Sequence, residues 1–117
     1  MFDKRKEPRK KIMTFTPVYI QNPRTLLGYL EDLTLHGARV VGDIVLEEGK
    51  IVHLSIEFPD GTPDLPAHPF LIHARVVRVQ TDKAKFENLG FEFLDVTEEQ
   101  TSILEALIQR YEFKRII

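Results

Sequence analysis

The chain has 117 residues, no cysteine and no tryptophan, and 43% of its residues are hydrophobic. This composition supports one domain with a buried core and disfavours a disordered chain or a small disulfide-stapled scaffold. The net charge of −2, from 16 basic and 18 acidic side chains, argues against a protein that is basic throughout. The absence of cysteine fits a cytoplasmic protein, and no apolar run reaches the roughly 18 residues of a membrane-spanning helix.

The charge is unevenly distributed along the chain. Residues 1–11 contain six basic and two acidic side chains, a net charge of +4, so the other 106 residues together carry −6. This segment has almost no apolar residues, and Pro8 would interrupt a helix there. We therefore expect residues 1–11 to be a flexible basic segment attached to a folded domain over residues 12–117.

Six segments of the remaining chain are rich in β-branched and aromatic residues and are separated by turn formers, which predicts six short strands. They are Ile12–Ile20, Thr25–Leu33, Ala38–Val41, Lys50–Phe58, Phe70–Gln80 and Asn88–Leu94. Residues 59–69 contain four prolines and are expected to form a surface loop.

A helix is expected only at the end of the chain. Thr97-Glu98-Glu99-Gln100 matches a capping box, and an apolar stripe at helical spacing follows it. These patterns predict a helix over about residues 97–113 that packs on the open end of a barrel. The predicted fold class is all-β, a small antiparallel barrel with a C-terminal α-helix.

The sequence contains no motif typical of an enzyme or a metal site. There is no Gly-x-Ser-x-Gly elbow and no glycine-rich phosphate loop. The four histidines lack metal-type spacing, although His53 and His73 fall on predicted strands where they could be neighbours. We therefore expect no catalytic residue, no metal and no cofactor.

Two short motifs carry chemistry that points to a ligand. Arg5 and Arg9 lie four residues apart, and arginine binds phosphate bidentately and can contact a guanine edge or stack on a base. Asp32 and Thr34 alternate with two leucines before Gly37, which allows a positive φ or a close backbone approach. Taken alone, the first motif is typical of a solvated charge run and the second of an ordinary turn.

Taken together, the two motifs resemble the signature of the PilZ domain family, R-x-x-x-R followed by [DN]-x-S-x-x-G between two strands. The resemblance extends over nearly the whole chain. It implies a six-stranded antiparallel β-barrel with a C-terminal helix, and binding of the bacterial second messenger cyclic di-GMP. Thr34 stands where the family usually has serine; its methyl group stiffens χ1 and adds bulk, so we expect a reduced affinity.

The resemblance also implies the roles of the site residues. Arg5 and Arg9 would bind the phosphates and guanines of the ligand, and Asp32 would accept hydrogen bonds from a guanine edge. Thr34 and Gly37 would complete the site. Secondary candidates are Lys4, Lys6, His36 and Arg75. In the family, a basic residue beside the first arginine tends to accompany binding of a stacked pair of ligands. We therefore expect either one ligand or a stacked pair here.

The expected function is that of a stand-alone, single-domain receptor, because Arg5 lies five residues from the start. It would pass the signal to an unidentified partner protein, in motility, exopolysaccharide production or biofilm formation. A first alternative is a PilZ-like interaction module that does not bind nucleotide. A second is binding of nucleic acid or a membrane surface through the basic segment, which the sequence pI near 6.1 opposes.

Overall fold

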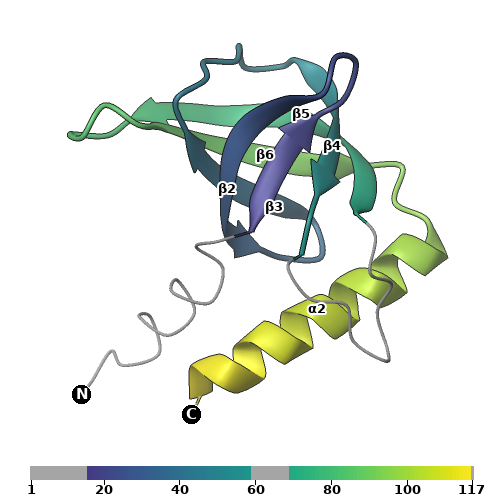
Figure 1. Ribbon diagram of the computed structural model, residues 1–117. Helices are drawn as coiled ribbons and strands as arrows, with labels where there is room; N and C mark the ends of the chain where they lie inside the picture. The colour runs from purple at the N-terminus through teal and green to yellow at the C-terminus, as the bar shows by residue number, and fades with distance from the viewer. Residues whose placement is uncertain (1–15, 59–68, 117) are drawn as a thin grey trace.

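The computed structural model describes residues 16–58 and 69–116. Six antiparallel strands form a closed barrel in the order β1-β2-β3-β6-β5-β4, and one helix follows them (Figure 1). The elements are β1 (Pro17–Ile20), β2 (Thr25–Leu33), β3 (Gly37–Gly42), β4 (Ile51–Ile56), β5 (Phe70–Thr81), β6 (Glu87–Leu94) and α2 (Glu98–Ile116). The predicted fold class, a six-stranded antiparallel barrel with a C-terminal helix, is confirmed.

The element boundaries differ slightly from those expected. Strand β1 begins at Pro17, and residues 12–15 lie outside the described part of the chain, as do residues 1–11 and 59–68. Strand β4 ends at Ile56, so Phe58 lies beyond it, although this side chain still packs against the core. The predicted strands thus occur in the predicted order, with ends shifted by a few residues.

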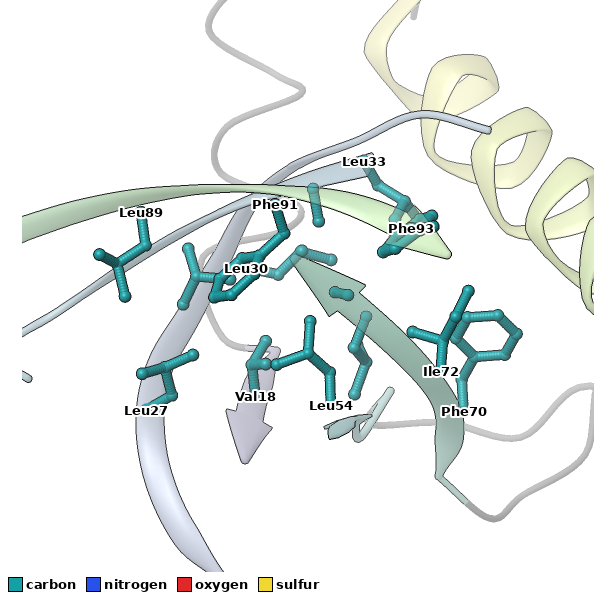
Figure 2. Packing of buried hydrophobic residues seen from close by; sticks show 14 of the residues in the cluster. Val18, Leu27, Leu30, Leu33, Leu54, Phe70, Ile72, Leu89, Phe91 and Phe93 are labelled. Atoms are coloured by element: carbon teal, nitrogen blue, oxygen red, sulfur yellow. The ribbon is translucent and has the colours of Figure 1, made fainter. Parts of the chain in front are cut away.

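The core fills the barrel with aliphatic and aromatic side chains from every strand. Side chains from different strands point toward one another in the interior, among them Val18, Leu30, Leu54 and Phe91 (Figure 2). They follow the period of two that a strand with one buried face requires. Burial of this apolar surface is the main stabilising term of a domain this size.

Beta-bulges interrupt the alternation in two of the strands. In β2 the pairing moves from Leu30 opposite Val40 to Asp32 opposite Arg39, which leaves Glu31 as an extra residue. In β5 the residue after Val76 is skipped in the same way. That residue, Val77, is 50% exposed, whereas simple apolar patterning assigns it to the core.

The C-terminal helix α2 lies across one end of the barrel (Figure 1). Its capping box forms as predicted, since the Thr97 hydroxyl accepts a hydrogen bond from the Gln100 amide at 3.1 Å and the Gln100 side chain accepts one from the Thr97 amide at 2.9 Å. Gln100 also donates to the Leu71 carbonyl at 2.9 Å. Leu104 and Leu107 are buried in the barrel core, so the helix closes it. No helix in the described ranges is both long and apolar enough to cross a membrane.

The two strand histidines are neighbours, as expected. His53 pairs directly with His73 across β4 and β5, and their ring centroids are 3.7 Å apart. Within residues 16–58 and 69–116, no group of three or more histidine or acidic side chains is placed to hold a metal ion.

Candidate ligand-binding site

The second motif forms the connection between β2 and β3. Leu33 is buried and Leu35 packs partly against the core, while Thr34 is exposed. This is the alternation expected from the sequence, in which the leucines anchor the segment and the polar side chains stay at the surface. The Thr34 amide donates to the Gly37 carbonyl at 2.9 Å, and this bond closes a tight turn around Leu35 and His36.

The hydroxyl of Thr34 organises this turn. It accepts hydrogen bonds from the amides of His36 and Gly37, both at 3.1 Å, and it lies 3.3 Å from the Gly37 carbonyl, to which it donates. A hydroxyl has one proton and two lone pairs, so all of its hydrogen-bonding capacity is used within the turn. The backbone amides of His36 and Gly37 are therefore already bonded to the Thr34 side chain.

Gly37 is required here by close backbone packing, and it does not have a positive φ. A Cβ atom added at this position would lie 2.1 Å from the carbonyl oxygen of Phe91 on β6. The carbonyl of His36 accepts a hydrogen bond from the Phe93 amide at 2.8 Å, which fixes the turn against the same strand. Of the two roles proposed for the glycine, the structure shows the close approach.

This turn borders an open hollow of about 430 Å³ on the barrel surface. Its lining residues come from the β2–β3 connection and from β3, β5 and β6; they are Asp32, Thr34, His36, Gly37, Ala38, Arg39, Val77, Phe91 and Glu92. A volume of this size lies within the range of small-molecule sites. The fold therefore brings together every predicted site residue of the second motif, with His36 beside them.

The charges around the hollow are mixed. Arg39 is the cation among its described lining residues, and Asp32 and Glu92 are the carboxylates. Arg39 Nε lies 3.1 Å from Glu31 Oε1, and the Arg75 guanidinium lies 3.2 Å from Glu92 Oε1. A doubly negative ligand would thus need further positive charge from outside this lining.

The remaining predicted residues are placed differently. Arg5 and Arg9, with the secondary candidates Lys4 and Lys6, lie outside the described residues. Arg75 is not part of the lining, but it is ion-paired with Glu92, which is.

Sequence reasoning missed Arg39 and the β5–β6 side of the hollow. Arg39 follows the motif by two residues, and the available signal was a charged residue between the apolar residues Ala38 and Val40. Val77 reaches the surface through a bulge, which no sequence pattern marked. Phe91 and Glu92 enter the site because β6 pairs with β3, a contact between residues far apart in the sequence.

Comparison with solved structures agrees with this architecture. The PilZ domain of YcgR from Escherichia coli with c-di-GMP superposes with a TM-score of 0.65 at 17% identity, over 86% of this chain and 84% of that one. YcgR in complex with c-di-GMP gives a TM-score of 0.66 at 19% identity, over 84% of this chain and 42% of that one. The Bacillus subtilis inhibitor of motility MotI/DgrA gives 0.64 at 21% identity, over 81% of this chain and 46% of that one.

At these identities the superpositions show a shared fold, and the chain spans less than half the length of MotI/DgrA and of the longer YcgR chain. No curated protein matches the sequence. The family model described as PilZ domain matches residues 3–111, which is nearly the whole chain. This chain therefore belongs to the PilZ domain family.

Proposed function

We propose that this protein is a cytoplasmic, non-enzymatic receptor that binds cyclic di-GMP and relays the signal to a partner protein. The observation that carries the proposal is the seating of Asp32, Thr34 and Gly37 on one surface hollow, in a turn fixed by the Thr34 hydroxyl. YcgR, which has the same fold, was solved with c-di-GMP. A preformed turn favours binding because little order has to be gained there.

In this proposal the basic segment, residues 1–11, supplies the positive charge that the hollow lacks. The lining offers Arg39 against two carboxylates, so a ligand with two phosphates needs the cations of residues 1–11. Arg5 and Arg9 supply bidentate phosphate contacts and stack on the bases. Asp32 accepts from the N–H edge of a guanine, a pairing that fits a carboxylate acceptor.

The other candidates have supporting roles. Lys4 and Lys6 steer the anionic ligand toward the hollow, and His36, at the tip of the turn, contacts a base. Arg75 neutralises Glu92 and so removes a repulsive charge from the lining. The barrel over residues 12–117 then presents the signal to a partner, and motility is one such output because MotI/DgrA is described as an inhibitor of motility.

Isothermal titration with cyclic di-GMP tests the proposal and also reports whether one ligand or a stacked pair binds. We expect the wild-type protein to bind, and Arg5→Ala and Arg9→Ala each to weaken binding by about tenfold or more, because a charged hydrogen bond contributes about 1.5–3 kcal/mol. Lys11→Ala is the matched control, since it removes one positive charge from the same segment outside the motif. Absence of binding heat from wild-type protein, with equilibrium dialysis in agreement, would contradict the proposal.

A second candidate function is an interaction module that binds no nucleotide. The observation in its favour is that the Thr34 hydroxyl is fully used inside the turn, which can hold the β2–β3 connection without a ligand. The same titration separates the two functions. Capture of a partner that is unaffected by cyclic di-GMP, together with no binding heat, would support the module.

A further inference from the structure

Arg39 lies between two surface hollows. Its side chain lines the motif hollow described above, together with Asp32 and Thr34. Its Nε is ion-paired with Glu31, and Glu31 lines a second hollow of about 440 Å³. The second hollow is mostly apolar, and two of its walls are the exposed aromatic side chains Tyr29 and Phe86.

The bulge in β2 produces this arrangement. Asp32 is the residue paired with Arg39 on the neighbouring strand, and Glu31, the extra residue beside it, reaches the same arginine with its side chain. A regular pairing would place a single residue there. Arg39 therefore faces two carboxylates, one at the motif hollow and one at the apolar hollow.

We propose that Arg39 binds the anionic ligand of the motif hollow directly, in exchange for its ion pair with Glu31. This inference depends on the proposed binding of cyclic di-GMP. The side chains of Arg39 and Glu31 are 48% and 34% exposed, so water screens their attraction. Breaking this ion pair therefore costs little free energy. A phosphate or guanine edge can instead take two donors of the guanidinium at once, which is the stronger arrangement.

The exchange has a consequence on the other side of Glu31. Once Arg39 turns to the ligand, the Glu31 carboxylate is left without this partner at the edge of the apolar hollow. The surface around Tyr29 and Phe86 then gains an uncompensated negative charge only when ligand is bound. Ligand binding in the motif hollow thus changes the charge at the edge of the apolar hollow, because Arg39 leaves Glu31.

Titration of the wild-type protein and its variants with cyclic di-GMP tests the exchange. Arg39→Gln should bind about tenfold more weakly or worse, because a charged contact is lost. Glu31→Gln should bind about two- to fivefold more tightly, because the ligand no longer competes with a carboxylate for Arg39. Arg24→Gln is the matched control; Arg24 is also an exposed arginine paired with a glutamate, Glu57, but it is not part of the motif hollow. Its affinity should equal that of wild type.

Amide NMR at saturating ligand provides the second readout. In wild-type protein, Tyr29 and Phe86 should shift on ligand binding, and in Arg39→Gln these shifts should be lost although the ligand is bound. Unfolding midpoints of the variants verify that the barrel is intact. Arg39→Lys keeps the positive charge but loses the two-pronged guanidinium, so its affinity for cyclic di-GMP should lie between those of wild type and Arg39→Gln.

The outcomes separate this inference from the proposed function. No binding by wild-type protein would overturn both. Wild-type binding with an unchanged Arg39→Gln affinity would overturn only the role of Arg39. Weaker binding by Glu31→Gln would overturn the competition between Glu31 and the ligand.

Discussion

At the scale of single residues, Thr34 holds the turn of its motif through the hydrogen bonds of its own side chain. Its hydroxyl accepts from two amides of the turn and donates to the Gly37 carbonyl at 3.3 Å, the longest of the three bonds. Serine could make the same contacts, so the departure from the family pattern keeps the chemistry of the turn. The threonine methyl group is the one added feature, and its effect on affinity stays a prediction.

Two substitutions separate the hydroxyl from the methyl group. Thr34→Ser keeps the turn and removes the bulk, so we expect affinity for cyclic di-GMP to rise by no more than about threefold. Thr34→Val keeps the bulk and leaves two amides without their acceptor, which should cost about 1 kcal/mol of stability and about tenfold in affinity. Urea unfolding and calorimetric titration measure the two effects. A valine variant that binds as tightly as wild type would contradict this role of the hydroxyl.

Gly37 supports a prediction about stability. In Gly37→Ala the new Cβ would meet the Phe91 carbonyl oxygen at 2.1 Å, so the backbones of β3 and β6 must separate. Overpacking of this kind costs about 1–3 kcal/mol, equivalent to a fall of roughly 4–12 °C in the melting temperature. Gly90→Ala, on β6, is the matched control, because its Cβ would lie 3.2 Å from the Cβ of Arg78 on β5 and not against a carbonyl oxygen. Equal melting temperatures for the two variants would show that the close approach at Gly37 is unimportant.

At the scale of elements, the sequence predicted the strands but not their irregularities. Strand β3 was predicted because the segment Ala38–Val41 is short and rich in apolar residues and follows the turn former Gly37. The bulges at Glu31 and Val77 were not predicted, because an extra residue in one strand is defined by pairing with another strand. These bulges supply two features of the surface at and beside the site, the ion pair between Glu31 and Arg39 and the exposure of Val77. The features that depend on the pairing of strands could therefore not be predicted from the sequence.

The β5–β6 hairpin carries a prediction about pH. The Asp82 carboxylate accepts hydrogen bonds from the amides of Phe86 at 3.0 Å and Ala84 at 2.9 Å and from the side chain of Asn88 at 3.2 Å. The bond from the Phe86 amide is the main cause that lowers the pKa of Asp82 below its usual 3.8. Because the folded pKa is lowered, the stabilisation is complete above the usual value and is lost as the pH falls through the folded pKa.

A carboxyl-carbon NMR titration measures this effect. We expect Asp82 to titrate with a midpoint below 3.8, and the amide resonances of Ala84 and Phe86 to move together with it. Asn88→Ala removes one of the donors, so the midpoint should rise while staying below the usual value, since the Phe86 amide remains. A midpoint at or above 3.8 in the wild-type protein would show that these bonds do not hold the turn in solution.

At the scale of the whole molecule, the two parts of the signature differ in how far they could be predicted. The turn motif acquires a defined place because the fold seats it on a hollow between β3, β5 and β6. The arginine motif lies outside the described residues, so its role stays a prediction from the family signature and from charge. Residues 1–11 carry a net charge of +4 and the rest of the chain −6. This contrast favours a small anion over a long one. A polymer would extend over much of the acidic body, whereas a small dianion would contact only the hollow and the basic segment.

Salt dependence distinguishes these two kinds of anion. Binding of a single-stranded polymer through all six basic side chains of residues 1–11 would give a slope of about −4 in log K against log salt concentration. A ligand with two phosphates displaces fewer counterions, so we expect a slope no steeper than about −1.5 between about 50 and about 200 mM salt. Titrations with cyclic di-GMP and with an oligodeoxynucleotide of unrelated sequence, each at several salt concentrations, measure both slopes. Tight oligonucleotide binding with the steep slope, undiminished by excess cyclic di-GMP, would identify the basic segment as a nucleic-acid contact and remove its role in the receptor.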